Sequence, residues 1–577
     1  MLRIKKQLNF FIFDFPLYDF FDFRLYDLFI NLCLNFLYFY RKFQTMPTDC
    51  ISYQESGYFT SLINDYLNQK PDLQSLYHRF PTLENFEKQL IEKGENFNSQ
   101  DNSNRKILVS VLEKQYANLN VSDLTSVNIK SLSSSKTFTI TTGHQLNLFT
   151  GPLYFLYKIV STINLTKQLK AAYPEYNFVP IYWMATEDHD FEEINYFNLH
   201  GKKVRWNTEN GGPVGRLSTK GLDEVFDVFS LELGLGKNAE HLKKLFQEAY
   251  VKHSNLAEAT RFLANEIFGK TGLVIIDADD SELKKEFIPY AKEELLKQTS
   301  HQKVLETSEK LKDYNIQVNP REINLFYIED SLRERIIFQD DFYYVNNTKL
   351  KFSEAEILKL LQNNPEKFSP NVIMRPLYQE VILPNLCYIG GGGELAYWLE
   401  LKSYFEASNV TFPILLLRNS VLLATEKQAK KADKLGLSWK DLFLKQDALM
   451  NDKVKTFSQF SIDFTSQKEF LRKQFEDLNV MANATDKSFT GAVKAQEAKQ
   501  IKGLENLEKR LLKAEKKKHS DELERIADLQ NELFPNKNLQ ERIVNFSEFY
   551  LENGNVLIKK LFEELHPLEH EFKIIVL

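Results

Sequence analysis

The sequence contains few cysteines and no marked excess of either charge. Its 577 residues include three cysteines, Cys33, Cys50 and Cys387, with no close pair and no Cys-x-x-Cys motif. This pattern argues against a disulfide framework and a zinc ribbon, and it favours a reducing compartment, the cytoplasm. The formal net charge of −6 gives no electrostatic reason to expect a nucleic acid partner. A chain of this length predicts two or three domains.

Long hydrophobic runs are also scarce. The longest charge-free run near the N-terminus, Leu28 to Tyr40, is shorter than the roughly 20 residues of a membrane-spanning helix. Residues 1–45 still differ from the rest, because eleven are Phe and four are Tyr. No small-residue cleavage site precedes Met46, so we expect no signal peptide. We interpret residues 1–45 as a hydrophobic extension outside the native protein, with Met46 as the start; a membrane anchor is the alternative.

A strand–helix–strand pattern begins at residue 137. A β-branched run, Thr137 to Thr142, breaks at Gly143, and a second apolar strand runs from Phe178 to Met184. Between them, apolar residues recur at helical spacing from Leu153 to Leu169. Pro152 suits the first helical position, because the N–H that it lacks would find no partner there. A helix of this length lets the two strands lie parallel with a right-handed crossover.

Polar residues follow both strands, and ligands of open α/β sheets bind beyond the carboxyl ends of the strands. We therefore predict one crevice whose catalytic residues are His144, Gln145, Glu187, His189 and Asp190. Carboxylates crowded around an imidazole favour a charged His and suit general acid–base chemistry. Each cluster alone is also compatible with a turn or a helix cap without function. We predict no metal site, since ligands adjacent in sequence rarely converge on one ion.

Further apolar segments extend the alternation of strands and helices. They are Leu273 to Ile276, Leu386 to Ile389 and Pro413 to Leu417. Together with the first two strands they predict an α/β fold, with a Rossmann-like parallel sheet core and connective insertions. Ile323 to Val345 alternates around Asp340-Asp341 and predicts a β-hairpin inside an insertion.

The run Gly390 to Gly393 precedes Glu394 and opens a predicted helix that continues to Phe405. Glycines at a helix N-terminus let a ligand approach the backbone closely. The run lacks the Lys-Ser/Thr of a P-loop and the spacing of a dinucleotide fingerprint, and a flexible turn is the alternative.

Two arginines and one cysteine are further candidates. Arg216 and Arg375 are possible carboxylate clamps, because a guanidinium binds a carboxylate bidentately; surface ion pairs are the alternative. Cys387 lies in an apolar strand, so we expect a buried small hydrophobic residue rather than a nucleophile.

The C-terminal part changes character. Residues 496–533 lack proline, are rich in Lys and Glu, and carry an apolar stripe that is interrupted from Glu515 to Glu522. The pattern predicts a long helical hairpin or coiled coil, of which self-association is the usual purpose. A solvated helix packed on its own core is the alternative, and the interruption is either locally solvated or a turn.

These observations divide the chain into seven parts. They are the hydrophobic extension (1–45), an N-terminal helical part of the core (46–136), a first Rossmann-like βαβ unit (137–200), connective insertions with a further core strand near 273–276 (201–385), the end of the Rossmann-like core (386–425), the coiled coil (426–540) and a C-terminal return segment (541–577).

Several motifs occur in one order along the chain. They are Thr142-Gly143-His144-Gln145, Leu148-Phe149-Thr150-Gly151-Pro152-Leu153-Tyr154, Glu187-Asp188-His189-Asp190-Phe191, Ile194-Asn195, Gly212-Pro213-Val214-Gly215-Arg216, Arg321-Glu322-Ile323-Asn324, Arg375-Pro376, Gly390-Gly391, Glu394-Leu395-Ala396-Tyr397-Trp398 and Leu533-Phe534-Pro535-Asn536. Together they resemble the BshC family, the cysteine ligases of bacillithiol biosynthesis. The resemblance runs from about Met46 to the end, and the sequence departs from it at His144 and Gly392, where the family usually has Gln and Pro.

The resemblance implies a Rossmann-like core, a coiled coil that forms a homodimer, and binding of ATP or ADP. It also implies an enzyme that adds cysteine to glucosaminyl malate through an amide bond. On this basis we assign substrate binding to Asn195, Arg216, Arg375, Tyr397 and Trp398, and nucleotide binding to Gly390, Gly391, Gly393 and Glu394. Another nucleotide-binding amide ligase or nucleotidyl transferase, or a noncatalytic coiled-coil scaffold, are the alternatives.

Overall fold

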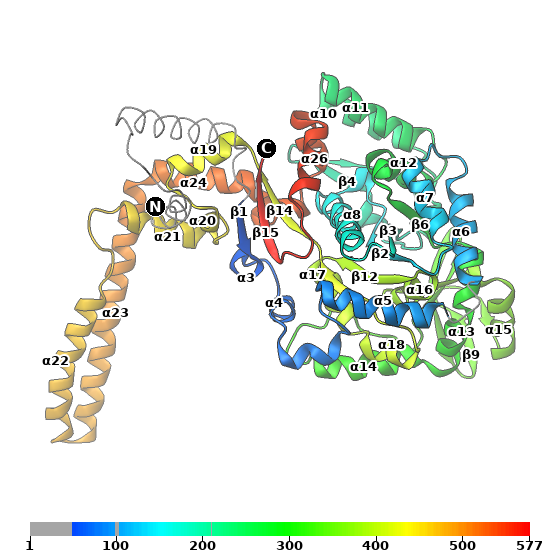
Figure 1. Ribbon diagram of the computed structural model, residues 1–577. Coiled ribbons are helices and arrows are strands. Elements are labelled where there is room, and N and C mark those ends of the chain that lie inside the picture. The colour runs from blue at the N-terminus through cyan, green and yellow to red at the C-terminus, as the bar shows by residue number, and fades with distance from the viewer. Residues whose placement is uncertain (1–48, 99–102, 209–210) are drawn as a thin grey trace, which may run out of the picture. The chain divides into compact units, whose positions relative to one another are not determined.

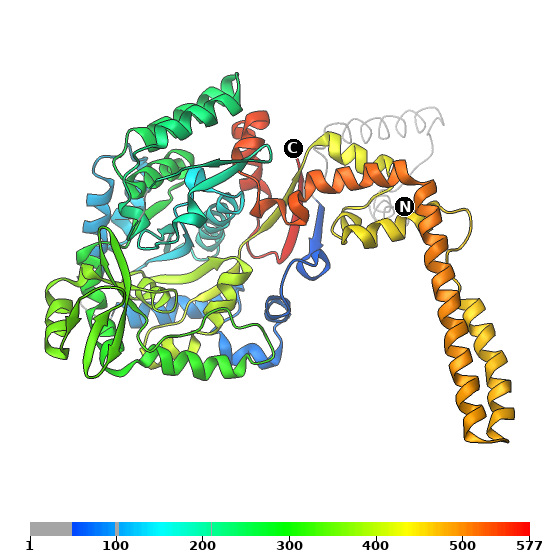
Figure 2. The same cartoon turned by 180° about the vertical axis from the view of Figure 1, so that it is seen from behind.

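The protein is described from a computed structural model, in which residues 49–98, 103–208 and 211–577 are placed (Figures 1 and 2). The extension assigned to residues 1–45 lies outside the described residues. Within the described part of the chain, no helix is long and apolar enough to cross a membrane.

The core contains a five-stranded parallel sheet (Figure 1). Its strands, in spatial order, are β13 (Ile414–Leu417), β12 (Asn385–Gly390), β2 (Thr137–His144), β3 (Asn177–Met184) and β6 (Val274–Asp277). The five strands predicted from the sequence are confirmed, and so is their parallel pairing. All residues of β2 are buried, as expected for a parallel strand that helices cover on both faces.

The first strand is longer than predicted. β2 continues through Gly143 and His144, which pair with Trp183 and Met184 of β3. The prediction that the strand breaks at Gly143 was therefore wrong. Glycine weakens a strand, but here the backbone pairing with β3 extends the strand through Gly143, and the sequence pattern alone does not reveal that pairing.

The predicted role of Pro152 was also wrong. The crossover helix α8 (Tyr154–Ala172) begins two residues later, and Pro152 forms an isolated antiparallel bridge with Asn545. The N–H of Leu153 donates to the carbonyl of Val544, at 2.9 Å. A contact with a segment almost 400 residues away in sequence thus fixes the backbone just before the helix starts.

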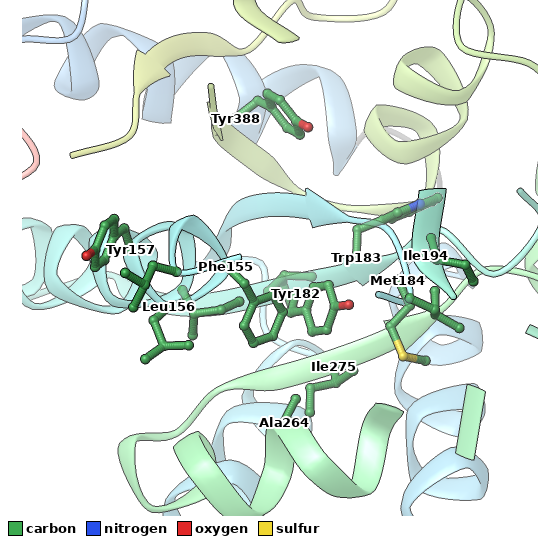
Figure 3. Packing of buried hydrophobic residues seen from close by; sticks show 14 of the residues in the cluster. Phe155, Leu156, Tyr157, Tyr182, Trp183, Met184, Ile194, Ala264, Ile275 and Tyr388 are labelled. Carbon is green, nitrogen blue, oxygen red and sulfur yellow. The ribbon is translucent and has the colours of Figure 1, made fainter. Parts of the chain in front are cut away.

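Helices cover both faces of the sheet, as Figure 3 shows for residues around β3. On one face, Phe155 of α8 packs edge-on against Tyr182 and also contacts Phe268 of α12 (Leu256–Phe268). On the other face, Trp183 packs against Tyr378 of α16 (Arg375–Ile382). Successive side chains of β3 therefore point to opposite helical layers, which is the alternation that a strand imposes.

An antiparallel sheet lies within the insertion between β6 and β12. Its strands, in spatial order, are β10 (Lys351–Phe352), β9 (Phe342–Val345), β8 (Leu332–Gln339), β7 (Leu325–Glu329) and β11 (Phe368–Pro370). The predicted hairpin turn is confirmed, since Asp340 and Asp341 connect β8 to β9 with φ of 50° and 62°. Asp tolerates this left-handed region better than most residues, and two such residues in succession suit a two-residue hairpin.

The two ends of the described chain meet in a third sheet. β15 (Glu571–Val576) lies between β1 (Asp49–Ser52) and β14 (Ser420–Ala424). A short hairpin, β4 (Tyr196–Leu199) and β5 (Lys202–Arg205), follows the first βαβ unit.

The predicted helical hairpin is present, but its two arms differ from the predicted stripe. α22 (Thr465–Asn483) packs along α23 (Lys487–Lys518), as both views show (Figures 1 and 2). The stripe over residues 496–533 is not one helix, because the chain bends at His519 before α24 (Ser520–Leu533). The sequence left open whether the polar interruption is a solvated stretch of helix or a turn. It is a bend between α23 and α24, after which α24 packs against α19 and α21.

The remaining helices complete the layers and insertions. They are α3 (Tyr53–Ser56), α4 (Ser61–Leu67), α5 (Leu83–Phe97), α6 (Ser103–Tyr116), α7 (Asp123–Ser131), α9 (Phe191–Ile194), α10 (Leu222–Leu233), α11 (Lys237–Phe246), α13 (Ser281–Lys297), α14 (Thr299–Lys310), α15 (Glu354–Asn363), α17 (Gly392–Leu399), α18 (Lys402–Ala407), α19 (Glu426–Lys434), α20 (Trp439–Leu442), α21 (Gln446–Phe457), α25 (Phe546–Asn553) and α26 (Asn555–Glu564). The single helix predicted from Glu394 to Phe405 is two helices, α17 and α18, with a break after Leu399.

A buried ion pair joins the sheet to the C-terminal segment. Arg418, which follows β13, donates from Nη2 to Oε1 of Glu541 at 2.7 Å, and both side chains are almost fully buried. The second carboxylate oxygen of Glu541 accepts the N–H of Val421 at 3.0 Å. Removal of one member of such a pair leaves an uncompensated buried charge.

We expect Glu541→Ala to lower the free energy of unfolding by about 3–5 kcal/mol, because Arg418 would stay buried without its counter-charge. Urea denaturation measures the loss. Glu426→Ala is the matched control: both it and its partner Lys430 are exposed, so we expect no measurable loss. Equal losses in the two variants would contradict the structural role of the buried pair.

Candidate functional site

A cavity of about 690 Å³ opens at the carboxyl edge of the parallel sheet. The ends of three neighbouring strands line it, with His144 from β2, Met184 from β3 and Tyr388 from β12. The two polar clusters predicted from sequence meet here: Nε2 of Gln145 donates to Oδ2 of Asp188 at 3.0 Å. The same amide donates to Oε2 of Glu193 at 2.9 Å, so Gln145 bridges two carboxylates.

His144 is a buried, neutral imidazole on the wall of this cavity. It packs between the rings of Tyr154 and Phe155 at the start of α8. Burial, together with the positive charge of Lys158, lowers the pKa of His144 to about 3. Its Nε2 has no hydrogen-bond partner among the described residues. An unpaired buried nitrogen that lines a cavity is a ready contact for a ligand.

His189 contacts an arginine that the sequence analysis missed. Arg333 of β8 approaches Nδ1 of His189 with its Nη1 at 2.7 Å, while its guanidinium lies 4.0 Å from the ring centre of Phe326. A guanidinium has no acceptor, so Nδ1 accepts in this contact. Arg333 thus adds a positive charge among the carboxylates of this turn.

The carboxylates of this turn differ in their environments. Burial would raise the pKa of Asp188, but hydrogen bonds from His189 and Gln145 and the charge of Arg333 hold it well below its usual range. Burial and the charge of Asp188 raise the pKa of Asp190. Burial also raises the pKa of Glu187, against the charge of Lys284, whose Nζ lies 2.6 Å from Oε1. Asp188 is therefore a permanent anion, whereas Glu187 and Asp190 are better placed to exchange protons.

The glycine turn after β12 carries a second group of charges. Glu394 accepts from the N–H of Gly391 at 2.8 Å and from the hydroxyl of Tyr388 at 2.7 Å. Nζ of the buried Lys158 lies 2.6 Å from its Oε2. Burial would raise the pKa of Glu394, but Lys158 and these hydrogen bonds hold it below its usual value. Glu394 thus organises the turn as a fixed anion and joins α17 to α8.

Arg375 reaches the cavity from the start of α16. Its Nη2 donates to the hydroxyl of Tyr397 at 2.7 Å. A Cβ added to Gly143 would lie 3.2 Å from the Tyr388 hydroxyl and 3.8 Å from Nη1 of Arg375. Glycine at the end of β2 therefore leaves the space that these two side chains occupy. No described carboxylate pairs directly with Arg375, which leaves its charge available to an anion.

Basic residues outnumber acidic ones on the cavity wall. Among the described residues, seven basic side chains line it, against the four carboxylates of Glu187, Asp188, Asp190 and Glu394. The basic residues are Lys158, Arg321, Arg333, Arg335, Arg375, Arg418 and Arg542. Of these, sequence reasoning proposed Arg375 alone. Arg418 carried a usable signal, since it directly follows a predicted strand at the same edge, whereas Arg333 and Arg335 come from the inserted sheet and carried none.

Four predicted site residues do not line the cavity. Asn195 and Trp398 are buried in the core, where Trp398 packs on Tyr388, and Gly390 lies within β12. Arg216 is held elsewhere: it donates to both carboxylate oxygens of Asp279 at 2.7 and 2.9 Å. This arginine already has the carboxylate that a clamp would bind. His144, Gln145, Glu187, His189, Asp190, Arg375, Tyr397, Gly391, Gly393 and Glu394 are brought together.

Asp188, His189 and Asp190 also converge more closely than adjacent residues usually do. One ligand atom from each lies within 4.8 Å of the others, so the three could in principle surround a metal ion. Arg333 contacts the same cluster through His189, and its positive charge opposes a bound cation there. The donor set therefore fits a metal poorly in this arrangement.

The burial of His144 has a consequence for stability. Its pKa is lower in the folded protein than in the unfolded chain, so the unfolded state binds a proton first as pH falls below about 6.5. We expect His144→Gln to remove this acid sensitivity. Between pH 7 and pH 5 the free energy of unfolding of the wild type should fall by about 2 kcal/mol more than that of the variant.

Urea denaturation at both pH values measures this difference. His301→Gln, on α14 outside the cavity, is the control and should show no comparable gain. An identical pH dependence in the wild type and His144→Gln would refute the assignment of a neutral buried imidazole.

Comparison with known proteins identifies two family regions. Residues 46–419 match the N-terminal Rossmann-like domain of bacillithiol biosynthesis BshC, and residues 421–577 match its C-terminal coiled-coil domain. Curated relatives named "Putative cysteine ligase BshC" occur in Flavobacterium johnsoniae, Flavobacterium psychrophilum and Christiangramia forsetii, at 69%, 66% and 62% identity. Each alignment covers 92% of this chain, and 100%, 99% and 99% of the respective relative. The chain therefore belongs to the BshC family of bacillithiol biosynthesis.

Proposed function

We propose that this protein is a cysteine ligase that joins cysteine to glucosaminyl malate in the last step of bacillithiol biosynthesis. The names of its relatives support a cysteine ligase. The observation that carries the proposal is the excess of basic side chains on the cavity wall. Glucosaminyl malate brings two carboxylates and cysteine a third, and such anions bind where guanidinium groups are not already neutralised.

The reaction forms a bond between the carboxyl carbon of cysteine and the nitrogen of the glucosamine amine. One carboxyl oxygen of cysteine leaves with the activating group, and the amine loses a proton. Glu187 or Asp190 takes this proton, since burial raises the pKa of both above that of an ordinary carboxylate. The Nε2–H of His189 donates to the oxygen on which negative charge develops, because its Nδ1 is turned to Arg333.

The malate carboxylates bind at Arg375 and Tyr397 in this proposal. The hydrogen bond between them orients the guanidinium, which no described carboxylate pairs with directly. Arg321 and Arg335 lie on the same wall and have no ion pair with any described residue. The thiol of cysteine takes no part in the bond that forms, so the product carries a free thiol.

We place the nucleotide, ATP or ADP, at the glycine turn. Gly391 and Gly393 line the cavity beside Arg418, whose Nε is buried and unpartnered among the described residues. A Cβ on Gly391 would lie 3.8 Å from this Nε, so the guanidinium and the turn face the same space. These donors fit a phosphate group. A bound ATP would supply the activation of the cysteine carboxylate.

We further propose a cytoplasmic homodimer that associates through the helical hairpin. Apolar side chains on α22 and α23 remain exposed in the single chain, among them Phe470 and Leu507 at 65% and 52%. They face a groove of about 670 Å³ on the hairpin. Burial of such a surface against a second copy would remove apolar area from water.

The activity is tested by thiol formation from cysteine and glucosaminyl malate, with and without ATP. We expect His189→Ala to lower kcat/KM about 100-fold, since a positioned acid–base group contributes on this order. His301→Ala, a histidine outside the cavity, is the matched control and keeps the wild-type rate. An unchanged rate in His189→Ala would remove His189 from the mechanism, and nucleotide consumption without a thiol product would indicate a different ligase or a nucleotidyl transferase.

The dimer is tested with the double variant Phe470→Ser/Leu507→Ser. We expect it to shift the protein from dimer to monomer in sedimentation experiments, because it removes two exposed apolar side chains of the hairpin. Leu231→Ser, at a comparably exposed apolar residue on α10, should leave the dimer intact. A wild-type monomer at all concentrations would rule out the proposed assembly.

A further inference from the structure

A chain of alternating charges runs from the cavity wall to the surface of the inserted sheet. Glu187 lines the cavity, and its Oε1 lies 2.6 Å from Nζ of Lys284. The same Nζ lies 3.0 Å from Oδ1 of Asp279. Asp279 in turn accepts two hydrogen bonds from Arg216, whose Nη1 donates to Asp330 at 3.1 Å. Anion and cation alternate through five side chains.

Lys284 is the central member of this chain and is hidden from the cavity. Its side chain, on α13, is 3% exposed and does not line the cavity wall. Burial of an ammonium group is costly unless anions compensate it, and Lys284 has two carboxylates within 3.0 Å. Burial would lower its pKa, but Glu187 and Asp279 raise it above the usual value, so it remains charged.

The loop that carries Arg216 is fixed against the strand end that carries Glu187. The N–H of Gly215 donates to the carbonyl of Thr186 at 2.8 Å, and that of Val214 donates to the carbonyl of Asp188 at 2.7 Å. A Cβ on Gly215 would lie 2.6 Å from Cβ of Thr186, a distance that only glycine permits. The loop therefore packs directly behind the acidic turn, and its guanidinium holds Asp279 beside Lys284.

We propose that Lys284 is a positioning residue that keeps Glu187 as the ionised base for the substrate amine, and that Asp279 and Arg216 hold Lys284 in place. The inference rests on the proposed ligase activity and narrows its general base to Glu187. The proton moves from the amine nitrogen to the Glu187 carboxylate, and Lys284 neither gains nor loses one. Arg216, expected from sequence to clamp substrate, acts instead through this chain.

The charged and titratable groups around Glu187 fix the direction of the pH effect. Lys284 from α13 and Arg333 from β8 favour its ionised form, and Asp279 disfavours it. The hydroxyl of Tyr378 on α16 is also close, and burial together with the charges of Glu187 and Asp279 raises its pKa, so it stays protonated. Removal of the nearest positive charge therefore raises the pKa of Glu187. A base works only when deprotonated, so the acidic limb of the pH profile moves to higher pH.

The test compares pH profiles of kcat/KM for thiol formation. We expect Lys284→Met to move the acidic limb up by about one pH unit or more, since an opposite charge at this distance shifts a carboxylate by 1–3 units. The loss should appear in kcat, with KM for both substrates unchanged, because Lys284 does not line the cavity. Lys284→Arg restores the charge and should return the limb toward the wild type.

Lys285→Met is the matched control. This neighbouring lysine is exposed and pairs with Glu282, so its loss should leave the profile in place. If Lys284→Met fails to fold, Arg216→Gln is the deciding variant. It leaves Asp279 without its arginine partner, so the negative charge of Asp279 offsets more of the charge of Lys284. The pKa of Glu187 should then rise, and the acidic limb should move up by a smaller amount. A folded Lys284→Met, or Arg216→Gln in its place, with an unmoved limb overturns the inference.

A second readout separates this inference from the ligase activity. Infrared difference spectra between the wild type and Glu187→Gln report the titration of the Glu187 carboxyl without any substrate. Its midpoint should rise in Lys284→Met and stay in place in Lys285→Met. Absence of a thiol product in the wild type would reject the proposed function, whereas an unmoved infrared midpoint would reject the role of Lys284.

Discussion

The parallel pairing of β2 with β3 is the constraint on which the site depends. The two strands pair over eight consecutive positions, from Thr137 with Asn177 to His144 with Met184. Because parallel strands end at one edge, this register fixes where the residues after each strand lie. Gln145 can reach Asp188 only because His144 and Met184 end their strands level with each other. A shift by one position would turn His144 away from α8.

Buried ion pairs then convert this edge into a defined set of charges. Lys158 holds Glu394 at the glycine turn, and Lys284 holds Glu187 at the acidic turn. Such pairs recover at best the cost of desolvation, so they contribute little net stability. Their effect is to fix the ionisation and position of the carboxylates that face the cavity, while Arg321, Arg335 and Arg375 remain available to anions.

The sequence predicted the five core strands, and most of the site residues that it proposed do line the cavity, because those strands are apolar runs and the polar residues directly follow them. It misplaced Pro152, whose bridge to Asn545 joins segments far apart in the chain. It assigned Arg216 to substrate binding, because the motif that contains this arginine does not show which carboxylate the arginine contacts. That carboxylate belongs to Asp279, which follows a different strand. It missed Arg333, which enters the site from an insertion. Each of these differences is a contact between distant segments.

The sequence by itself thus determined which segments are buried strands, the sheet edge at which the candidate site lies and the family to which the chain is similar. Local periodicity and the residues that end each strand suffice for that, because they act within a few positions of one another. Only the tertiary structure decided which charges meet. Nδ1 of His189 faces a guanidinium because β8 brings Arg333 to it, and Arg216 lies behind the site because Asp279 neutralises it there. Electrostatic partners are set by distance in space, which periodicity along the chain does not encode.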